Sequence, residues 1–144
     1  MKVETPEYKN VLVAIDPYST FQPVMNRALK LVSSPDQISL IHVTLPYAYF
    51  EPYSLEIGQD FVSDMLDKSK AKLTEIADTH GIPKQNVHAV LGNASDEIHQ
   101  VAEDNLIDLI VIGTHGQSGL KLLLGSTANS VLHGAKCDVL AVRV

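Results

Sequence analysis

Cysteine is almost absent from this sequence, since Cys137 is the only one in 144 residues. A single thiol forms no internal disulfide, and it fits a reducing compartment, where a lone cysteine usually serves as a small apolar filler. Long apolar runs are absent too: none approaches the roughly 20 residues that a membrane helix needs. The first ten residues are polar and of mixed charge, without the apolar segment of a secretory signal. We therefore expect a cytoplasmic protein that does not enter a membrane.

Basic residues are also few, with 11 Lys and Arg against 17 Asp and Glu and a formal net charge of -6. Such a field repels polyanions, so we expect no nucleic acid and no anionic membrane surface as partner. A small anion held by backbone amides remains compatible with it. The length fits one domain, 1–144, with one core that needs no disulfide or metal, and the composition is that of an ordinary globular protein.

Apolar segments of strand length alternate with amphipathic segments of helical period, which is typical of a parallel sheet covered by helices. The expected strands are 10–15, 38–44, 87–91, 106–112 and 139–144. The expected helices are 21–31, 59–79, a third beginning at Ser95, and 126–134. We expect Ser19 and Thr20 to offer N-cap oxygens to the first helix and Ser95 to cap the third, while Gly81 ends the second.

Three features fall at the carboxyl ends of the expected strands, where open parallel sheets place their ligand crevice. Asp16 follows the first strand, GTHG (113–116) follows the fourth, and GST (125–127) precedes the last helix. Each alone is more often a turn or a helix cap, but they converge on one edge. Free amides at a helix start favour phosphate, so 125–128 form a candidate phosphate seat. Asp16 suits a ribose hydroxyl, an adenine amine or a bridging metal.

Other candidate residues favour structural interpretations. His42 lies in a strand of buried character and is expected to be a hydrogen-bonded core residue, whereas His115 is expected to be solvated. The six histidines show no metal-ligand spacing, and the aromatic loop 45–57 is expected to pack over the sheet edge. The segment before Ser126 lacks the lysine of a phosphate-binding loop, and no nucleophile motif occurs. Binding is therefore better supported than turnover, and no catalytic residue is assigned.

Several segments together carry a family resemblance. They are VAID at 13–16, HV at 42–43, DLIVIG at 108–113, the glycines at 113 and 116, GS at 125–126, and CDVLAV at 137–142. Over essentially the whole chain they resemble the universal stress protein family. The resemblance implies an open five-stranded parallel α/β sheet of order 3-2-1-4-5 with helices on both faces. It also implies ATP binding at the crevice, because members with the glycine motif bind ATP there.

Carried over by position, the resemblance assigns a nucleotide-binding role to eleven residues. Ala14, Ile15 and Asp16 would flank the nucleoside, with Asp16 near the ribose or a metal. Val43 would meet adenine through its backbone, and Ile112 and Gly113 would line the ribose. The residues expected to contact phosphates are Gly116, Gly125, Ser126, Thr127 and Ala128. ATP is the expected ligand, with AMP or ADP as alternatives, and Mg²⁺ or Mn²⁺ could accompany it.

Two departures from the family pattern concern the same crevice. Only eight residues, 117–124, separate Gly116 from Gly125, one fewer than usual, which shortens the loop over the phosphates. Ala14 stands where proline is common, and Pro17 follows Asp16, which bears on the path of that loop. Phosphate geometry is more affected by these departures than adenine recognition.

The last strand is expected to pair with its copy. It runs from Val139 to Val144, and an apolar edge strand is a liability unless it is paired or covered. The family commonly forms dimers there, so we predict an antiparallel homodimer. The leading hypothesis is thus a homodimeric, ATP-binding stress-response or signalling module with little or no hydrolysis. The alternatives are an interaction protein of the same fold that binds no nucleotide and, less favoured, a slow ATPase or adenylate-forming hydrolase.

Overall fold

The computed structural model describes residues 8–45, 58–114 and 125–144. In these ranges five parallel strands form one sheet of order β3-β2-β1-β4-β5. The strands are β1 (Val11–Ala14), β2 (Ile38–Thr44), β3 (Val87–Leu91), β4 (Leu109–Gly113) and β5 (Asp138–Val142). The helices are α1 (Gln22–Leu29), α2 (Gly58–His80), α3 (Ala94–Asp104) and α4 (Ser126–Gly134), with short 3-10 turns η1 (Pro35–Gln37) and η4 (Lys84–Asn86). The expected open parallel α/β fold and its strand order are confirmed.

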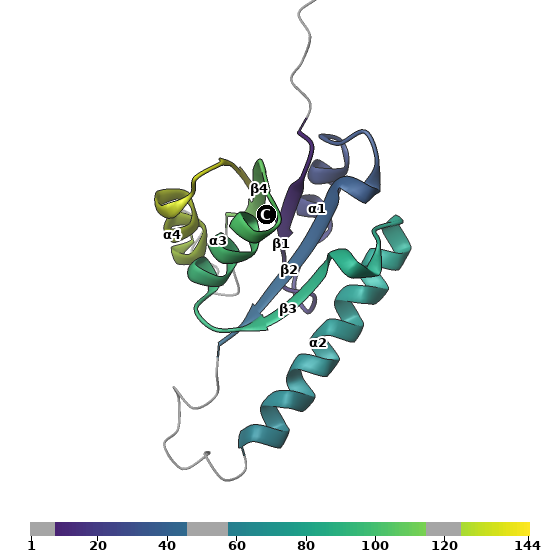
Figure 1. Cartoon of the computed structure of the whole chain (residues 1–144), viewed down its shortest axis with the longest axis vertical. Helices are drawn as coiled ribbons and strands as arrows, with labels where there is room; N and C mark the ends of the chain where they lie inside the picture. The colour runs from purple at the N-terminus through teal and green to yellow at the C-terminus, as the bar shows by residue number, and fades with distance from the viewer. Residues whose placement is uncertain (1–7, 46–57, 115–124) are drawn as a thin grey trace, which may run out of the picture.

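Helices cover both faces of the sheet, with α1 and α2 on one side and α3 and α4 on the other (Figure 1). The alternation of side chains along β1 explains this arrangement. Val11 and Val13 pack toward α1 and α2, while Leu12 between them packs toward α3 and α4, and all three are fully buried. A strand buried on both faces needs apolar residues at successive positions, which is the pattern that the sequence shows.

The helix termini correct two predictions. Phe21, and not Ser19 or Thr20, is the N-cap of α1, and no side chain caps that helix. Asn93, and not Ser95, caps α3, since its Oδ1 accepts from the backbone N–H of Asp96 at 3.1 Å. Asparagine at this position has the extended backbone that an N-cap needs and an oxygen of suitable reach.

The second and third helices both end with a residue in the left-handed backbone region. Gly81, as predicted, ends α2 with φ at 74°, and the N–H of Ile82 donates to the carbonyl of Ala77. At the end of α3 the same geometry falls on Leu106, with φ at 52°. The expected strand 106–112 therefore begins late, at Leu109, because its first residues form this turn.

The aromatic loop expected to cover the sheet edge lies, beyond Leu45, outside the described residues, as does His115. Within the described part of the chain, no helix combines the length and apolar character needed to cross a membrane.

Candidate functional site

A cavity of about 380 Å³ lies at the carboxyl ends of β1, β2 and β4. β1 sits between β2 and β4, so strand order reverses beside it, and this switch point is where open α/β sheets bind ligands. The volume is within the range of small-molecule pockets. The lining comprises Ala14, Ile15, Asp16, Ser19, Thr20, Phe21, Val24, Ile41, His42, Val43, Ala94, Ile98, Ile112, Gly113, Gly125, Ser126, Thr127, Ala128 and Val144.

The structure brings together every residue of the predicted site that it describes. Four segments distant in the sequence supply them: the end of β1, the end of β2, the end of β4 and the start of α4. Of the eleven predicted positions, only Gly116 is missing from this lining, because it lies outside the described residues. The shared edge follows from the fold, since the carboxyl ends of parallel strands meet on one side of a sheet.

A tight turn orients the carboxylate of Asp16. The carbonyl of Asp16 accepts from the N–H of Ser19 at 3.1 Å, and its Oδ1 accepts from the N–H of Tyr18 at 2.9 Å. The sequence Asp-Pro-Tyr-Ser suits such a turn, because aspartate is favoured at the first position and proline at the second. Pro17 thus closes the loop directly after Asp16 and keeps that residue at the mouth of β1.

His42 forms a hydrogen bond to the main chain and also lines the cavity. Its Nδ1 lies 3.2 Å from the carbonyl oxygen of Ile15, as the predicted hydrogen bond requires, but the side chain is half-buried and not part of the core. It also lines the cavity beside Val43, a role that sequence reasoning did not assign. The signal available in the sequence was its position, one residue before Val43 at the same strand end.

The loop before α1 contributes residues that sequence reasoning placed elsewhere. Ser19 and Thr20 line the cavity instead of capping α1, and Phe21 joins them. Val24, on the first turn of α1, continues the wall. Their proximity to Asp16 in the sequence could have indicated this position. We assigned Ser19 and Thr20 to the cap of the first helix and therefore did not place them in the site.

Gly113 is close to its neighbours even without a side chain. A Cβ added there would lie 3.1 Å from Cγ2 of Val144 and 3.5 Å from Cγ2 of Val24. Both valines also line the cavity, so a side chain at position 113 would crowd Val144 at the cavity wall. Sequence reasoning did not assign Val144 to the site, although the expected strand order already placed the end of the last strand beside the fourth strand.

The start of α4 presents backbone amides to the cavity wall. Gly125 is the N-cap, with φ at −56° and ψ at 150°, and it has no side chain to cap the helix. The first carbonyl-bonded amide of this helix is that of Asn129, which donates to the carbonyl of Gly125 at 2.9 Å. The N–H groups of Ser126, Thr127 and Ala128 therefore lack partners within their own helix, as in any first turn. Such amides suit an anion.

The charges around the cavity are few. Among its described lining residues Asp16 has the single carboxylate side chain, and none is lysine or arginine. The described residues contain no group of three or more His, Cys, Asp or Glu side chains that could hold a metal ion. The cavity therefore offers a carboxylate that accepts hydrogen bonds, several hydroxyls, helix amides that suit an anion, and apolar walls.

The fold and the position of the cavity define a doubly wound α/β protein with its crevice at the switch point. Residues 7–143 match the model of the universal stress protein family, and the chain belongs to that family. Universal stress protein A homolog 2 of Coxiella burnetii is 41% identical over 141 residues, which cover 95% of this chain and 96% of that protein. Homolog 1 of the same organism is 38% identical over 138 residues, covering 94% and 96%.

Solved structures show the same architecture. The protein MJ0577 is 25% identical, with a TM-score of 0.73 over 96% of this chain and 98% of that one. A universal stress protein in complex with cAMP is 26% identical, with a TM-score of 0.55 over 96% and 98%.

Proposed function

We propose that this chain is a cytoplasmic, single-domain (1–144) universal stress protein that binds an adenine nucleotide and acts as a homodimeric signalling module. ATP is the first candidate ligand, and AMP or ADP are the others. Little or no hydrolysis is expected, because the described lining has no lysine or arginine to stabilise a transferring phosphoryl group. The observation that carries the proposal is the gathering of the described predicted residues around one cavity at the switch point.

The nucleoside half of the proposed site lies over β1, β2 and β4. Val43 would contact the base through its backbone, and Ile112 and Gly113 would line the sugar. Asp16 would accept a hydrogen bond from a ribose hydroxyl. The complex of a similar universal stress protein with cAMP supports an adenine nucleotide as the ligand class.

The phosphate half is proposed at the start of α4. The amides of Ser126, Thr127 and Ala128 would donate to phosphate oxygens, and the positive end of the helix dipole adds to the attraction. Gly116 would join them from the segment outside the described residues. This arrangement explains how a chain of net charge -6 can hold a small anion.

A divalent metal fits only as a partner of the nucleotide. Asp16 has the one carboxylate side chain among the described lining residues, and its Oδ1 already accepts a backbone hydrogen bond. Mg²⁺ usually binds proteins through one or two carboxylates together with substrate phosphates and water. We therefore propose Asp16 as a ligand to Mg²⁺ or Mn²⁺ only together with a bound nucleotide.

Calorimetric titration with ATP, AMP and adenosine tests the proposal, with GTP as the control for the base. Saturable binding of the adenine compounds is expected. Ser126→Pro is the sharpest variant, because it removes one amide at a helix position that tolerates proline, and Gly125 already has the extended backbone that precedes proline. ATP affinity should fall about tenfold, while adenosine affinity stays unchanged.

The matched control is Ser130→Ala, one turn further along α4, exposed and outside the cavity lining. It should bind ATP like the wild type. Absence of any adenine nucleotide binding by the wild type, together with no thermal shift, would refute the proposal and favour an interaction protein that binds no nucleotide.

The homodimer is proposed through β5, which pairs only with β4 within this sheet. Val139 and Leu140 are half-buried, and Ala141 and Val144 are exposed, so the strand offers an apolar edge. Sedimentation equilibrium at micromolar concentration should give the mass of a dimer. A monomer would refute the pairing, and Ala141→Lys, which adds a charge at this edge, should weaken it. The control Leu132→Lys, on the exposed surface of α4, should leave the mass unchanged.

A further inference from the structure

We infer that His42 is a positioning residue for sugar recognition: by holding the carbonyl of Ile15, it fixes Asp16 for a hydrogen bond to a ribose hydroxyl. The inference rests on the proposed function, since it concerns the same cavity. His42 needs no direct contact with the sugar for this role, because its effect passes through one peptide group.

The geometry begins with the planarity of that peptide. The carbonyl oxygen of Ile15 and the Cα of Asp16 belong to one rigid unit, so anchoring the oxygen restricts the orientation of the Asp16 backbone. His42 Nδ1 lies 3.2 Å from this oxygen. The N–H of the same Ile15 donates to the carbonyl of Ile41 at 3.1 Å. Two successive residues of β2 thus hold both polar backbone groups of Ile15.

This anchor lies where the strand ladder ends. β1 ends at Ala14, which pairs with Ile41 of β2, so Ile15 lies just beyond the last paired residue. On its far side Asp16 enters the turn closed by the N–H groups of Tyr18 and Ser19. Asp16 is therefore held from both directions, by its own turn and by the His42 side chain through Ile15.

The chemistry of the contact selects the informative variants. A carbonyl oxygen only accepts, so Nδ1 of His42 must carry the hydrogen. Asparagine places an amide N–H at the corresponding position of the side chain. Leucine has comparable bulk and no donor, and glutamine moves its donor one bond further from the backbone.

Titration with AMP and with its 2′-deoxy and 3′-deoxy forms tests the inference. The wild type should bind AMP about tenfold more tightly than it binds the weaker of the two deoxy forms, which is the effect of one hydrogen bond to a carboxylate. We call this quotient of affinities the ratio. Asp16→Asn should reduce this ratio, which establishes that the ratio reports on Asp16. In His42→Leu the ratio should fall close to one while the affinity for the deoxy form is retained, and His42→Asn should restore the ratio.

His88→Leu is the matched control, because His88 is a half-buried histidine on the neighbouring strand β3 and does not line the cavity. It should leave the ratio as in wild type. If His42→Leu does not fold, the comparison of His42→Asn with His42→Gln decides, since only the former should keep the ratio.

Three results would overturn the inference. His42→Leu could discriminate as wild type does, it could lose affinity equally for AMP and the deoxy forms, or the wild type could show no discrimination at all. Failure of the proposed function is distinguishable from these results, because the wild type would then bind none of the nucleotides.

Discussion

The two ends of the parallel strands use their polar groups differently. At the amino ends, polar groups bond to one another: Asp108 accepts from the N–H groups of Lys9 at 2.9 Å and Asn10 at 3.0 Å. Tyr8 also donates its hydroxyl to Asp138 at 2.7 Å, and this hydrogen bond raises the pKa of Tyr8. At the carboxyl ends, Asp16 lines the cavity. We expect substitutions at the amino ends to change stability and those at the cavity to change binding.

Asp108→Ala should have the largest effect on stability and none on nucleotide affinity. The carboxylate joins the segment before β1 to the start of β4 through two backbone hydrogen bonds. At roughly 1 kcal/mol for each, its loss should lower the free energy of unfolding by about 2 kcal/mol. Urea denaturation measures this change, and calorimetry with AMP checks the affinity.

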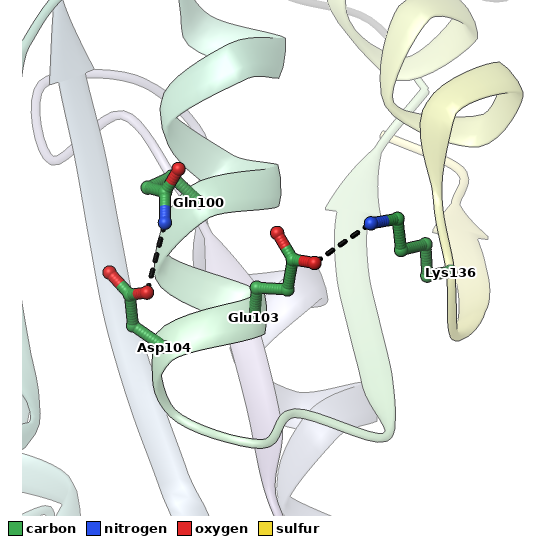
Figure 2. A network of polar contacts seen from close by, with 4 residues as sticks. All are labelled: Gln100, Glu103, Asp104 and Lys136. Carbon is green, nitrogen blue, oxygen red and sulfur yellow. Dashed lines mark hydrogen bonds and ion pairs between the residues drawn. The ribbon is translucent and has the colours of Figure 1, made fainter.

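Asp104→Ala is the control for Asp108. Asp104 accepts from Gln100 at 2.9 Å on the exposed surface of α3, as Figure 2 shows. A pair of this spacing on a helix surface contributes little, so the change should stay within about 0.5 kcal/mol. Equal effects of the two substitutions, or a loss of AMP affinity in Asp108→Ala, would contradict the division between the two ends.

Asn93→Ala should show that the carboxyl ends also contain structural polar groups. Asn93 caps α3 and lies next to Ala94, which lines the cavity. Loss of this cap should cost about 1 kcal/mol of unfolding free energy. Ser95→Ala, which removes only the bond from Ser95 Oγ to Asn93 Oδ1, should cost less. The reverse order in thermal or urea denaturation would restore Ser95 as the cap.

Leu106→Gly should stabilise the amino end. Leu106 is 81% exposed and has φ at 52°, so it loses strain on replacement and gives up little buried surface. Glycine adopts this backbone without penalty but also frees the unfolded chain, which leaves an expected gain of about 0.5 kcal/mol. Leu106→Ala keeps the strained backbone and should show no gain in the same urea denaturation. A destabilised Leu106→Gly variant would show that the exposed side chain contributes packing.

Local patterns predicted the alternating strands and helices and placed Asp16, Gly113 and the start of the last helix at one edge, whereas the strand order and the other candidate site residues came from the family resemblance. Continuous apolar runs indicated the buried strands, and the glycines and Asp16 fell at strand ends that the parallel topology brings together. Helix caps were less predictable, because Asn93 and Ser95 are both residue types that cap helices well. Which of them caps α3 depends on where β3 ends and the helix begins. The contact of His42 with Ile15 joins two strands, and no local pattern indicates it.

The smallest expected effect concerns the exposed ion pair of Lys136 and Glu103 at the amino end (Figure 2), whose Nζ and Oε1 lie 2.8 Å apart. The hydrogen bond from Lys136 lowers the pKa of Glu103 below its ordinary value of 4.5. A carboxylate with a lowered pKa contributes stability above its ordinary pKa, and this contribution disappears as pH falls through the folded value. Lys136→Ala should therefore raise the pKa of Glu103 and leave a small stability difference near neutral pH that vanishes in acid.

Carboxyl NMR titration measures the shift, and Lys68→Ala, which breaks the exposed pair with Asp64 on α2, should leave Glu103 unchanged. Identical titration of Glu103 in the wild type and in Lys136→Ala would show that this exposed ion pair is not maintained in solution.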